Sequence, residues 1–207
     1  MTSATPNHQN VSAAEQTPAA RIGAVLFKNR GWLPVPFLVV PVLAMQELTT
    51  RNLLIGAIVM VIGEWWRMWG VATAGTVTRR RSRNVQKLVS HGPFSWSRNP
   101  LYNGNFLLWM GIITISGVYW FLPVAAVIFA VEYYYIVRYE EGVLESIFGQ
   151  VYLDYKAKTP RWFPRPPKPE DAQGEFFWAE AWRSEISTFM QFAAIIALFW
   201  AKDRFLS

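Results

Sequence analysis

Two clusters of polar residues, separated by apolar runs, carry the side chains that could do chemistry in this chain. The first is the stretch 88–104, LVSHGPFSWSRNPLYNG, which contains one histidine, one arginine, two prolines and three aromatic residues. The second is the pair Glu140 and Glu141. Arginine binds phosphate and carboxylate groups, and glutamates attract cations and accept protons. The two clusters therefore indicate a site for a charged ligand.

The stretch 88–104 is too rigid and too aromatic for a simple connector. Gly92-Pro93 and Asn99-Pro100 constrain the backbone, and Trp96 adds a large surface that needs a partner. One alternative is an interfacial loop, with its aromatic rings at headgroup level and Arg98 on a lipid phosphate. The glutamate pair favours a functional site, because the expected topology returns it to the same side of the membrane.

The composition is typical of a membrane protein. Of 207 residues, 52% are hydrophobic, and only 16% are charged, against roughly 25% in an average soluble domain. The net charge of +6 is explained by basic loops between apolar spans rather than by nucleic-acid binding. The chain has no cysteine, which excludes disulfides, thiolate nucleophiles and zinc ribbons, and His8 and His91 alone cannot form a metal site.

The apolar runs predict an all-α fold, a polytopic membrane helical bundle of four core transmembrane helices and an expected fifth. The first run, 31–46, contains Pro41, which should kink a helix. The second, 52–77, has only Glu64 and Arg67 as charged residues. Because they are three residues apart, they share a helix face, and we expect a structural ion pair rather than a ligand contact.

The uncharged run 101–131 is about 46 Å long as a straight helix, which is too long for one crossing. A turn near Ser116-Gly117 should divide the region into spans 101–115 and 118–137. Arg98 then enters this hairpin and Glu140 and Glu141 leave it on the same, cytoplasmic side. The fifth run, 186–201, is expected to span the membrane rather than to lie in the interface.

The chain divides into three parts, and its basic and amphipathic segments are expected to lie at the cytoplasmic face. Residues 1–20 predict a disordered tail, residues 21–167 the membrane domain, and residues 168–207 a linker with a C-terminal membrane helix. A basic cluster marks the cytoplasmic face: Arg79, Arg80, Arg81, Arg83 and Lys87. Apolar residues that recur every three or four positions from Val143 to Tyr155 predict a cytoplasmic amphipathic helix.

Prolines dominate the segment that follows this predicted helix. The run TPRWFPRPPKP cannot be helical and predicts an extended segment, with Arg161, Trp162 and Arg165 at the lipid headgroups. Within the glutamate pair, adjacent helical residues point about 100° apart, so the two carboxylates cannot make the same contact. Glu140 lies on the side defined by Val143 and Leu144, and we expect it to face the pocket.

With these motifs in place, the sequence resembles a family of integral-membrane methyltransferases, the isoprenylcysteine carboxyl methyltransferases and phospholipid N-methyltransferases. GPFSWSRNPLYNG resembles the family pattern G-P-Y-x-x-x-R-H-P-x-Y-x-G, and Glu140-Glu141 resembles the family's glutamate pair. A third match is L-x-x-x-F-G-x-x-Y-x-x-Y, from Leu144 to Tyr155, ahead of TPRWFP. The departure is Asn99, where the family has histidine; asparagine forms hydrogen bonds but carries no proton.

The resemblance implies binding of S-adenosylmethionine and methyl transfer to a membrane lipid or lipid-modified acceptor, at the cytoplasmic face. Catalytic roles fall on Arg98, Asn99, Glu140 and Glu141. Cofactor-binding roles fall on the following residues: His91, Gly92, Pro93, Phe94, Arg98, Pro100, Tyr102 and Glu140. Arg98 would bind the cofactor carboxylate, and Glu140 or Glu141 would face the ammonium or sulfonium and serve as base for an amine acceptor. A metal is not implied.

Two other classes remain open at this point. Sterol reductases have a similar membrane core and an arginine motif but use NADPH. A non-catalytic membrane protein that keeps the fold is the third possibility, and Asn99 is the observation in its favour. The sequence identifies neither the acceptor, nor O- as against N-methylation, nor the oligomeric state.

Overall fold

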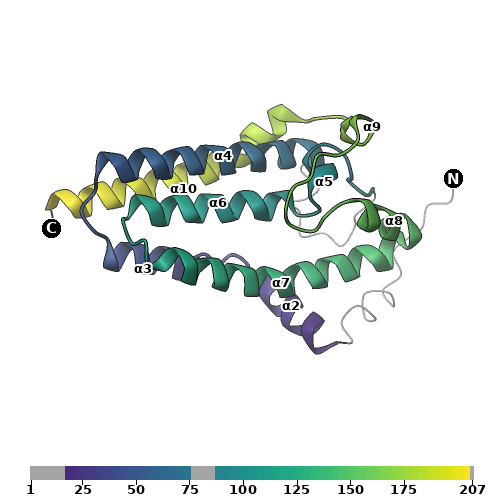
Figure 1. Ribbon diagram of the computed structural model, residues 1–207, viewed down its shortest axis with the longest axis horizontal. Helices are drawn as coiled ribbons and strands as arrows, with labels where there is room; N and C mark the ends of the chain where they lie inside the picture. Colours follow the sequence, from purple (N-terminus) through teal and green to yellow (C-terminus); the bar gives the residue numbers. More distant parts are fainter. Residues whose placement is uncertain (1–16, 76–86, 206–207) are drawn as a thin grey trace.

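The computed structural model describes residues 17–75 and 87–205 and is all-helical within them, as predicted. Long helices run side by side along one axis (Figure 1). The expected tail falls mostly on residues 1–16, and the basic residues Arg79 to Arg83 fall on residues 76–86, so both lie outside the described residues. Helix α2 begins at Pro18, within the segment that was expected to be disordered.

Helices α4 (Thr50–Ala74) and α6 (Pro100–Ile115) form the centre of the bundle. Glycines spaced seven residues apart allow the two backbones to meet. A methyl group on Gly63 would lie 2.9 Å from the carbonyl oxygen of Gly104, and one on Gly111 would lie 2.7 Å from that of Gly56. Small residues are the usual means of close helix packing in membranes. This packing fixes α6 relative to α4, and with it the end of the loop formed by residues 88–99, which we call the motif loop.

Helix α7 (Phe121–Phe148) completes the predicted hairpin with α6. The turn lies where the sequence predicts it, at Ser116 and at Gly117, whose φ is 73°. Helix α2 (Pro18–Lys28) lies against α7 (Figure 1), and α3 (Val35–Ala44) contacts α6. The main apolar core joins α3, α6 and α7 and includes Phe37, Ile113, Phe121, Phe129 and Ile136.

Among the described residues, three helices are long and apolar enough to cross a membrane: α4, α7 and α10 (Trp178–Phe205). They correspond to the second, fourth and fifth predicted spans. The first span is shorter than expected, because α3 has 10 residues, about 15 Å at ~1.5 Å per residue. Its start is delayed by the entry turn at Pro34, and it ends at Met45, whose backbone is not helical. Helix α6, with 16 residues, is also short for a crossing.

The predicted amphipathic helix is divided into two helices. Its first half is the continuation of α7, which ends at Phe148, and its second half is α8 (Gln150–Lys158). Gly149, with a φ of 53°, lies at the break, a backbone conformation that glycine adopts without strain. The proline segment, residues 159–168, is not helical, as predicted, and leads through α9 (Pro169–Ala172) to α10.

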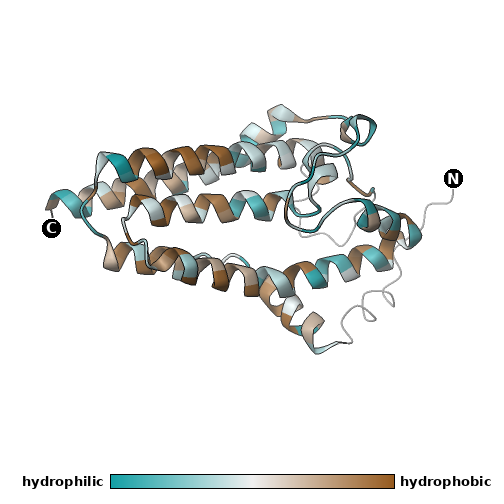
Figure 2. Cartoon of the chain, viewed as in Figure 1, coloured by the Kyte–Doolittle hydropathy of each residue, from teal (hydrophilic) through white to brown (hydrophobic). Residues whose placement is uncertain are grey.

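The described parts of the motif loop lie at one end of the bundle, with α5 (Pro93–Trp96), α8, the proline segment and α9 (Figure 1). We call this the site end. The turns before α4 and after α6 lie at the opposite end, together with the last residues of α10. Figure 2 shows hydrophobic residues gathered on α3, on α4 and on the first part of α7, whereas α8 and the loops at the site end are hydrophilic.

Candidate active site

Arg98, just before α6, forms a buried ion pair with Glu141 of α7. The Nε and Nη2 atoms of Arg98 donate to Oε1 of Glu141 at 3.0 and 2.9 Å. Its Nη1 donates to the carbonyl oxygens of Lys156 and Thr159, at 3.0 and 2.6 Å. The guanidinium therefore holds together the motif loop, α7 and the end of α8.

Arg161 approaches the same carboxylate from the proline segment. Its Nε lies 3.1 Å from Oε1 of Glu141, and its Nη2 lies 2.7 Å from Oε2. The hydrogen bond to Glu141 raises the pKa of Arg161. The sequence predicts Arg161 and Trp162 at the lipid headgroups; within the protein, Arg161 pairs with Glu141 and Trp162 packs against the apolar core. Arg165 is exposed and donates to the carbonyl oxygen of Lys158.

Glu140 makes a separate set of contacts, as the 100° between adjacent helical residues requires. Its Oε2 accepts a hydrogen bond of 2.8 Å from the hydroxyl of Tyr102, and Arg30 lies 4.0 Å from its Oε1. The Tyr102 ring lies 4.5 Å from that of Tyr133, between centroids. The Glu140 side chain is 29% exposed, whereas that of Glu141 is 6% exposed. Glu140 is thus the more accessible carboxylate.

Asn99 and Pro100 close the turn that starts α6. The backbone carbonyl of Asn99 accepts from the amides of Tyr102 and Asn103, and its side chain donates to the carbonyl of Arg161 at 3.0 Å. Pro100 is the first residue of α6, where its missing N–H costs nothing. The amide of Arg98 pairs with the carbonyl of Pro160 at 2.9 Å, so the proline segment runs along the loop. Asn99 therefore has a structural partner in place of a proton-transfer role.

His91, Gly92 and Pro93 form a second group, against the end of α4. Gly92 has a φ of 55°, and a methyl group there would lie 2.7 Å from the hydroxyl of Thr73. Phe94 contributes its carbonyl, which accepts a 2.7 Å hydrogen bond from Tyr155 of α8. Burial raises the pKa of the Tyr155 hydroxyl, which fits its role as a donor.

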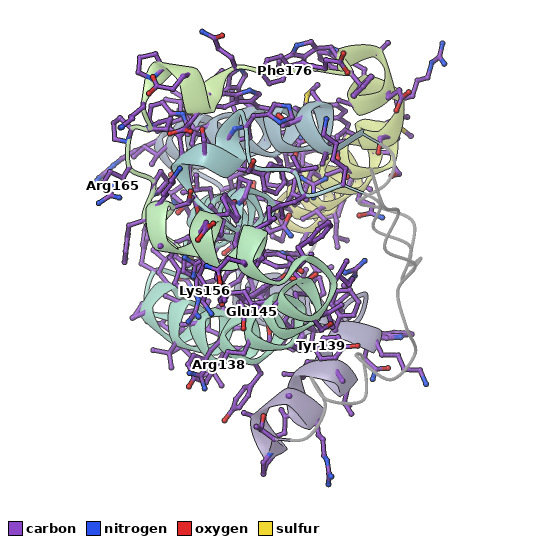
Figure 3. All side chains as sticks on the ribbon, turned by 90° about the vertical axis from the view of Figure 1, so that its right-hand side faces the viewer. Arg138, Tyr139, Glu145, Lys156, Arg165 and Phe176 are labelled. Carbon is purple, nitrogen blue, oxygen red and sulfur yellow. The ribbon has the colours of Figure 1, made fainter. Side chains whose placement is uncertain are left out.

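Figure 3 looks onto the site end. Glu145 and Lys156, which form an ion pair between α7 and α8, lie in the middle of this face. Phe176 lies at the edge formed by the C-terminal part of the chain, and Tyr139 lies toward α2. At this end, Arg98 meets Glu141 and Tyr102 meets Glu140, so the predicted catalytic residues of the motif loop and of α7 lie together.

Several residues at this end were not assigned to the site from the sequence. Arg30 comes from the N-terminal helix region, which has no motif, and Phe176 comes from a segment read only as a linker. Arg161 could have been found from the sequence, because it belongs to TPRWFP, the segment that follows the third family match. Glu64 and Arg67 form the predicted ion pair, at 3.3 Å, but Arg67 also pairs with buried Glu185 of α10.

Comparison with protein families places a phospholipid methyltransferase match on residues 52–151, which contain α4, the motif loop, α6 and α7. The protein-S-isoprenylcysteine O-methyltransferase of Mus musculus is 31% identical over 117 residues, covering 53% of this chain and 40% of that protein. Protein-S-isoprenylcysteine O-methyltransferase B of Arabidopsis thaliana is 30% identical over 117 residues, covering 53% of this chain and 57% of that protein.

A third relative carries a different name. The nickel-cobalt-cadmium resistance protein NccN of Alcaligenes xylosoxydans xylosoxydans is 34% identical over 83 residues, 40% of this chain and 38% of that protein. Among the described residues, no group of three or more histidines, aspartates or glutamates could hold a metal ion. No solved structure matches the chain. The matched part spans about 40 to 57% of the two methyltransferases, and the resemblance read from the motifs is confirmed over it.

Proposed function

We propose that this chain, whose core matches the phospholipid methyltransferase family over residues 52–151, is an integral-membrane methyltransferase that uses S-adenosylmethionine. The observation that supports this most is that the two adjacent glutamates differ in burial and in partners. Glu141 is buried between Arg98 and Arg161, whereas Glu140 stays accessible beside Tyr102. A membrane lipid or lipid-modified molecule is the proposed acceptor, because the site end joins helices that are apolar enough to cross a membrane.

The charged side chains at the site end fit the charges of S-adenosylmethionine, which supplies an activated methyl group when bound. The carboxylate of Glu140 suits a sulfonium or ammonium, and a guanidinium suits the amino-acid carboxylate. Arg98 uses Nε, Nη1 and Nη2 in contacts with Glu141 and two carbonyls. Arg161, whose side chain is 29% exposed, is therefore the better candidate for the cofactor carboxylate, and Arg98 organises the loop.

The proposed roles of the other residues follow from where they lie at the site end. Methyl transfer is an in-line displacement, so positioning supplies most of the catalysis. Tyr102 donates to Glu140 and holds its carboxylate in one orientation. An amine acceptor must lose a proton, which Glu140 can accept, and a carboxylate acceptor needs no base. His91, Gly92, Pro93 and Phe94 are proposed to line the adenosyl part.

Binding and transfer measurements test this function. The purified protein in detergent should bind S-adenosylmethionine, and binding of NADPH instead would favour the sterol-reductase alternative. Labelled methyl groups should then enter a species of a total lipid extract, which mass spectrometry identifies. Folded protein that bound neither cofactor would contradict the proposal and leave a non-catalytic membrane protein.

A further inference from the structure

Residues 172–177, which we call the C-terminal strap, lie over the start of the motif loop. The carbonyl of Ala172 accepts from the amide of Gly92 at 3.1 Å, and the carbonyl of Glu175 lies 3.1 Å from Nε2 of His91. The amide of Phe177 donates to the carbonyl of Ala72, in the last turn of α4, at 2.7 Å. The strap lies beyond residues 52–151, so it is outside the part of the chain that the family match covers.

The strap approaches the loop so closely that side chains are excluded at two positions. A methyl group on Gly174 would collide with the imidazole ring of His91. A methyl group on Gly92 would lie 3.0 Å from Cε1 of Phe176. The rings of His91 and Phe176 meet edge-on, with centroids 5.9 Å apart. The imidazole is thus bounded by Gly174 and by an aromatic ring of the same strap.

The strap is fixed beyond its end by an ion pair inside the bundle. Glu185 of α10 is fully buried and pairs with Arg67 of α4, and Arg67 also donates to Thr188 at 3.2 Å. These contacts hold α10 against α4 eight residues after Phe177. The ring of Phe177 itself lies 3.6 Å from a methyl group built on Gly75, the residue that follows α4. The strap therefore has attached ends, whereas Gln173 to Phe177 are solvent-exposed.

Resting on the function proposed above, we propose that the C-terminal strap is a wall of the cofactor site and that the adenine base binds on the exposed side of Phe176, with its edge at the contact between His91 Nε2 and the Glu175 carbonyl. The edge of adenine carries a hydrogen-bond donor, the exocyclic amine, beside a ring-nitrogen acceptor. The Glu175 carbonyl is an acceptor and the His91 Nε2–H is a donor, and they now satisfy each other. An adenine edge replaces that one bond by two, and Phe176 supplies an aromatic surface for the base.

Cofactor binding to two variants tests this assignment. Phe176→Ala should weaken binding of S-adenosylmethionine by about tenfold or more, since stacking of a base on an aromatic side chain is of that order. Trp182→Ala is the matched control: it removes an exposed aromatic ring of α10, outside the strap, so affinity should stay near that of the unmodified protein. Equal affinities for the two variants would overturn the proposal.

Two further measurements do not depend on these side chains. S-inosylhomocysteine, in which an oxygen replaces the exocyclic amine, should bind about tenfold more weakly than S-adenosylhomocysteine, because the Glu175 carbonyl loses its donor. Hydrogen exchange at residues 173–177 should slow when S-adenosylhomocysteine is bound. If hydrogen exchange at these residues stayed unchanged with ligand bound, the strap would not be a wall of the cofactor site, but the proposed function would stand. If the unmodified protein bound no S-adenosylhomocysteine, both the strap assignment and the proposed function would be wrong.

Discussion

Glu141 accepts two hydrogen bonds from Arg98 through a single oxygen, Oε1, at 3.0 and 2.9 Å. The other oxygen is occupied by Arg161 at 2.7 Å. Because Arg98 and Glu141 are both nearly buried, with side chains 8% and 6% exposed, each needs the other to offset the loss of water. The more buried glutamate of the pair is therefore tied into the framework, and the accessible one, Glu140, is left for chemistry.

Glu141→Gln should accordingly lower stability more than Glu140→Gln. Removing one partner of a buried ion pair costs about 3 to 5 kcal/mol, and here two arginines lose their counter-charge. Glu140→Gln keeps an acceptor for Tyr102 and should stay folded while losing most methyl transfer. Thermal unfolding in detergent, followed by transfer assays on the folded variants, separates the two effects. Equal unfolding temperatures would contradict the structural role of Glu141.

Glu185→Gln tests the attachment of α10 to the bundle. The change removes one of the two carboxylates that pair with Arg67, while Glu64 stays, and we expect a loss of about 3 kcal/mol in unfolding free energy. Glu180→Gln, five residues closer to the start of α10 and exposed, is the control and should change stability by less than about 0.5 kcal/mol. Chemical denaturation in mixed micelles measures both. If the variants unfolded alike, Glu185 would not hold the helix.

Gly63→Ala tests the close packing of α4 on α6. The added methyl group would lie 2.7 Å from Cβ of Leu107 and 2.9 Å from the carbonyl oxygen of Gly104, so the helices must separate. Overpacking of this kind costs about 1 to 3 kcal/mol. Gly31→Ala is a suitable control, because a methyl group at Gly31 meets no atom within 4 Å. A Gly63→Ala protein as stable as the control would show that the packing is not tight.

The all-helical class and the hairpin could be read from the sequence because apolar runs and glycine turns are local signals. Ser116-Gly117 and the Glu64–Arg67 pair are of this kind, since spacing alone brings the partners together. The break at Gly149 could not be read, because the apolar pattern continues across it at the same period. One glycine in a periodic run is compatible with either a continuous or a divided helix.

Contacts between distant segments were the part that sequence patterns could not supply. Nothing local to Glu141 indicates that it, rather than Glu140, meets Arg98 or that Arg161 joins them from 20 residues away. The Glu185–Arg67 pair joins α10 to α4 across 118 residues, and only packing determines it. The motifs named most of the residues at the site end, but the pairing among them depends on how α7, α8 and the proline segment converge.

Single cysteines can test which side of the membrane the site end faces, since the chain has none of its own. We propose the cytoplasmic side, because the basic residues Lys156, Lys158 and Arg165 lie there. A cysteine in place of Gln173 should then resist an impermeant maleimide in intact cells and react after lysis. A cysteine in place of Glu47, at the opposite end, should react in intact cells. The reverse pattern would invert the topology.

Alkaline pH should destabilise the protein partly through Tyr155. Burial raises the pKa of its hydroxyl above the ordinary value of 10.0, and the hydroxyl donates to the carbonyl of Phe94. A group whose pKa is higher in the folded state contributes stability that is complete below its unfolded pKa and is lost as the pH rises through the folded pKa. We therefore expect stability to fall as the pH rises above about 10, where the unfolded chain loses this proton first.

Tyr155→Phe should make that alkaline decline less steep but not abolish it, because burial also raises the pKa of Tyr152. At neutral pH the variant should be about 1 kcal/mol less stable, since the Phe94 carbonyl loses its donor. Unfolding temperatures between pH 7 and 11 measure both effects, with the exposed Tyr134→Phe as control. Curves for Tyr155→Phe and the unmodified protein that stayed parallel across this range would show that Tyr155 is not buried as a neutral donor against the motif loop.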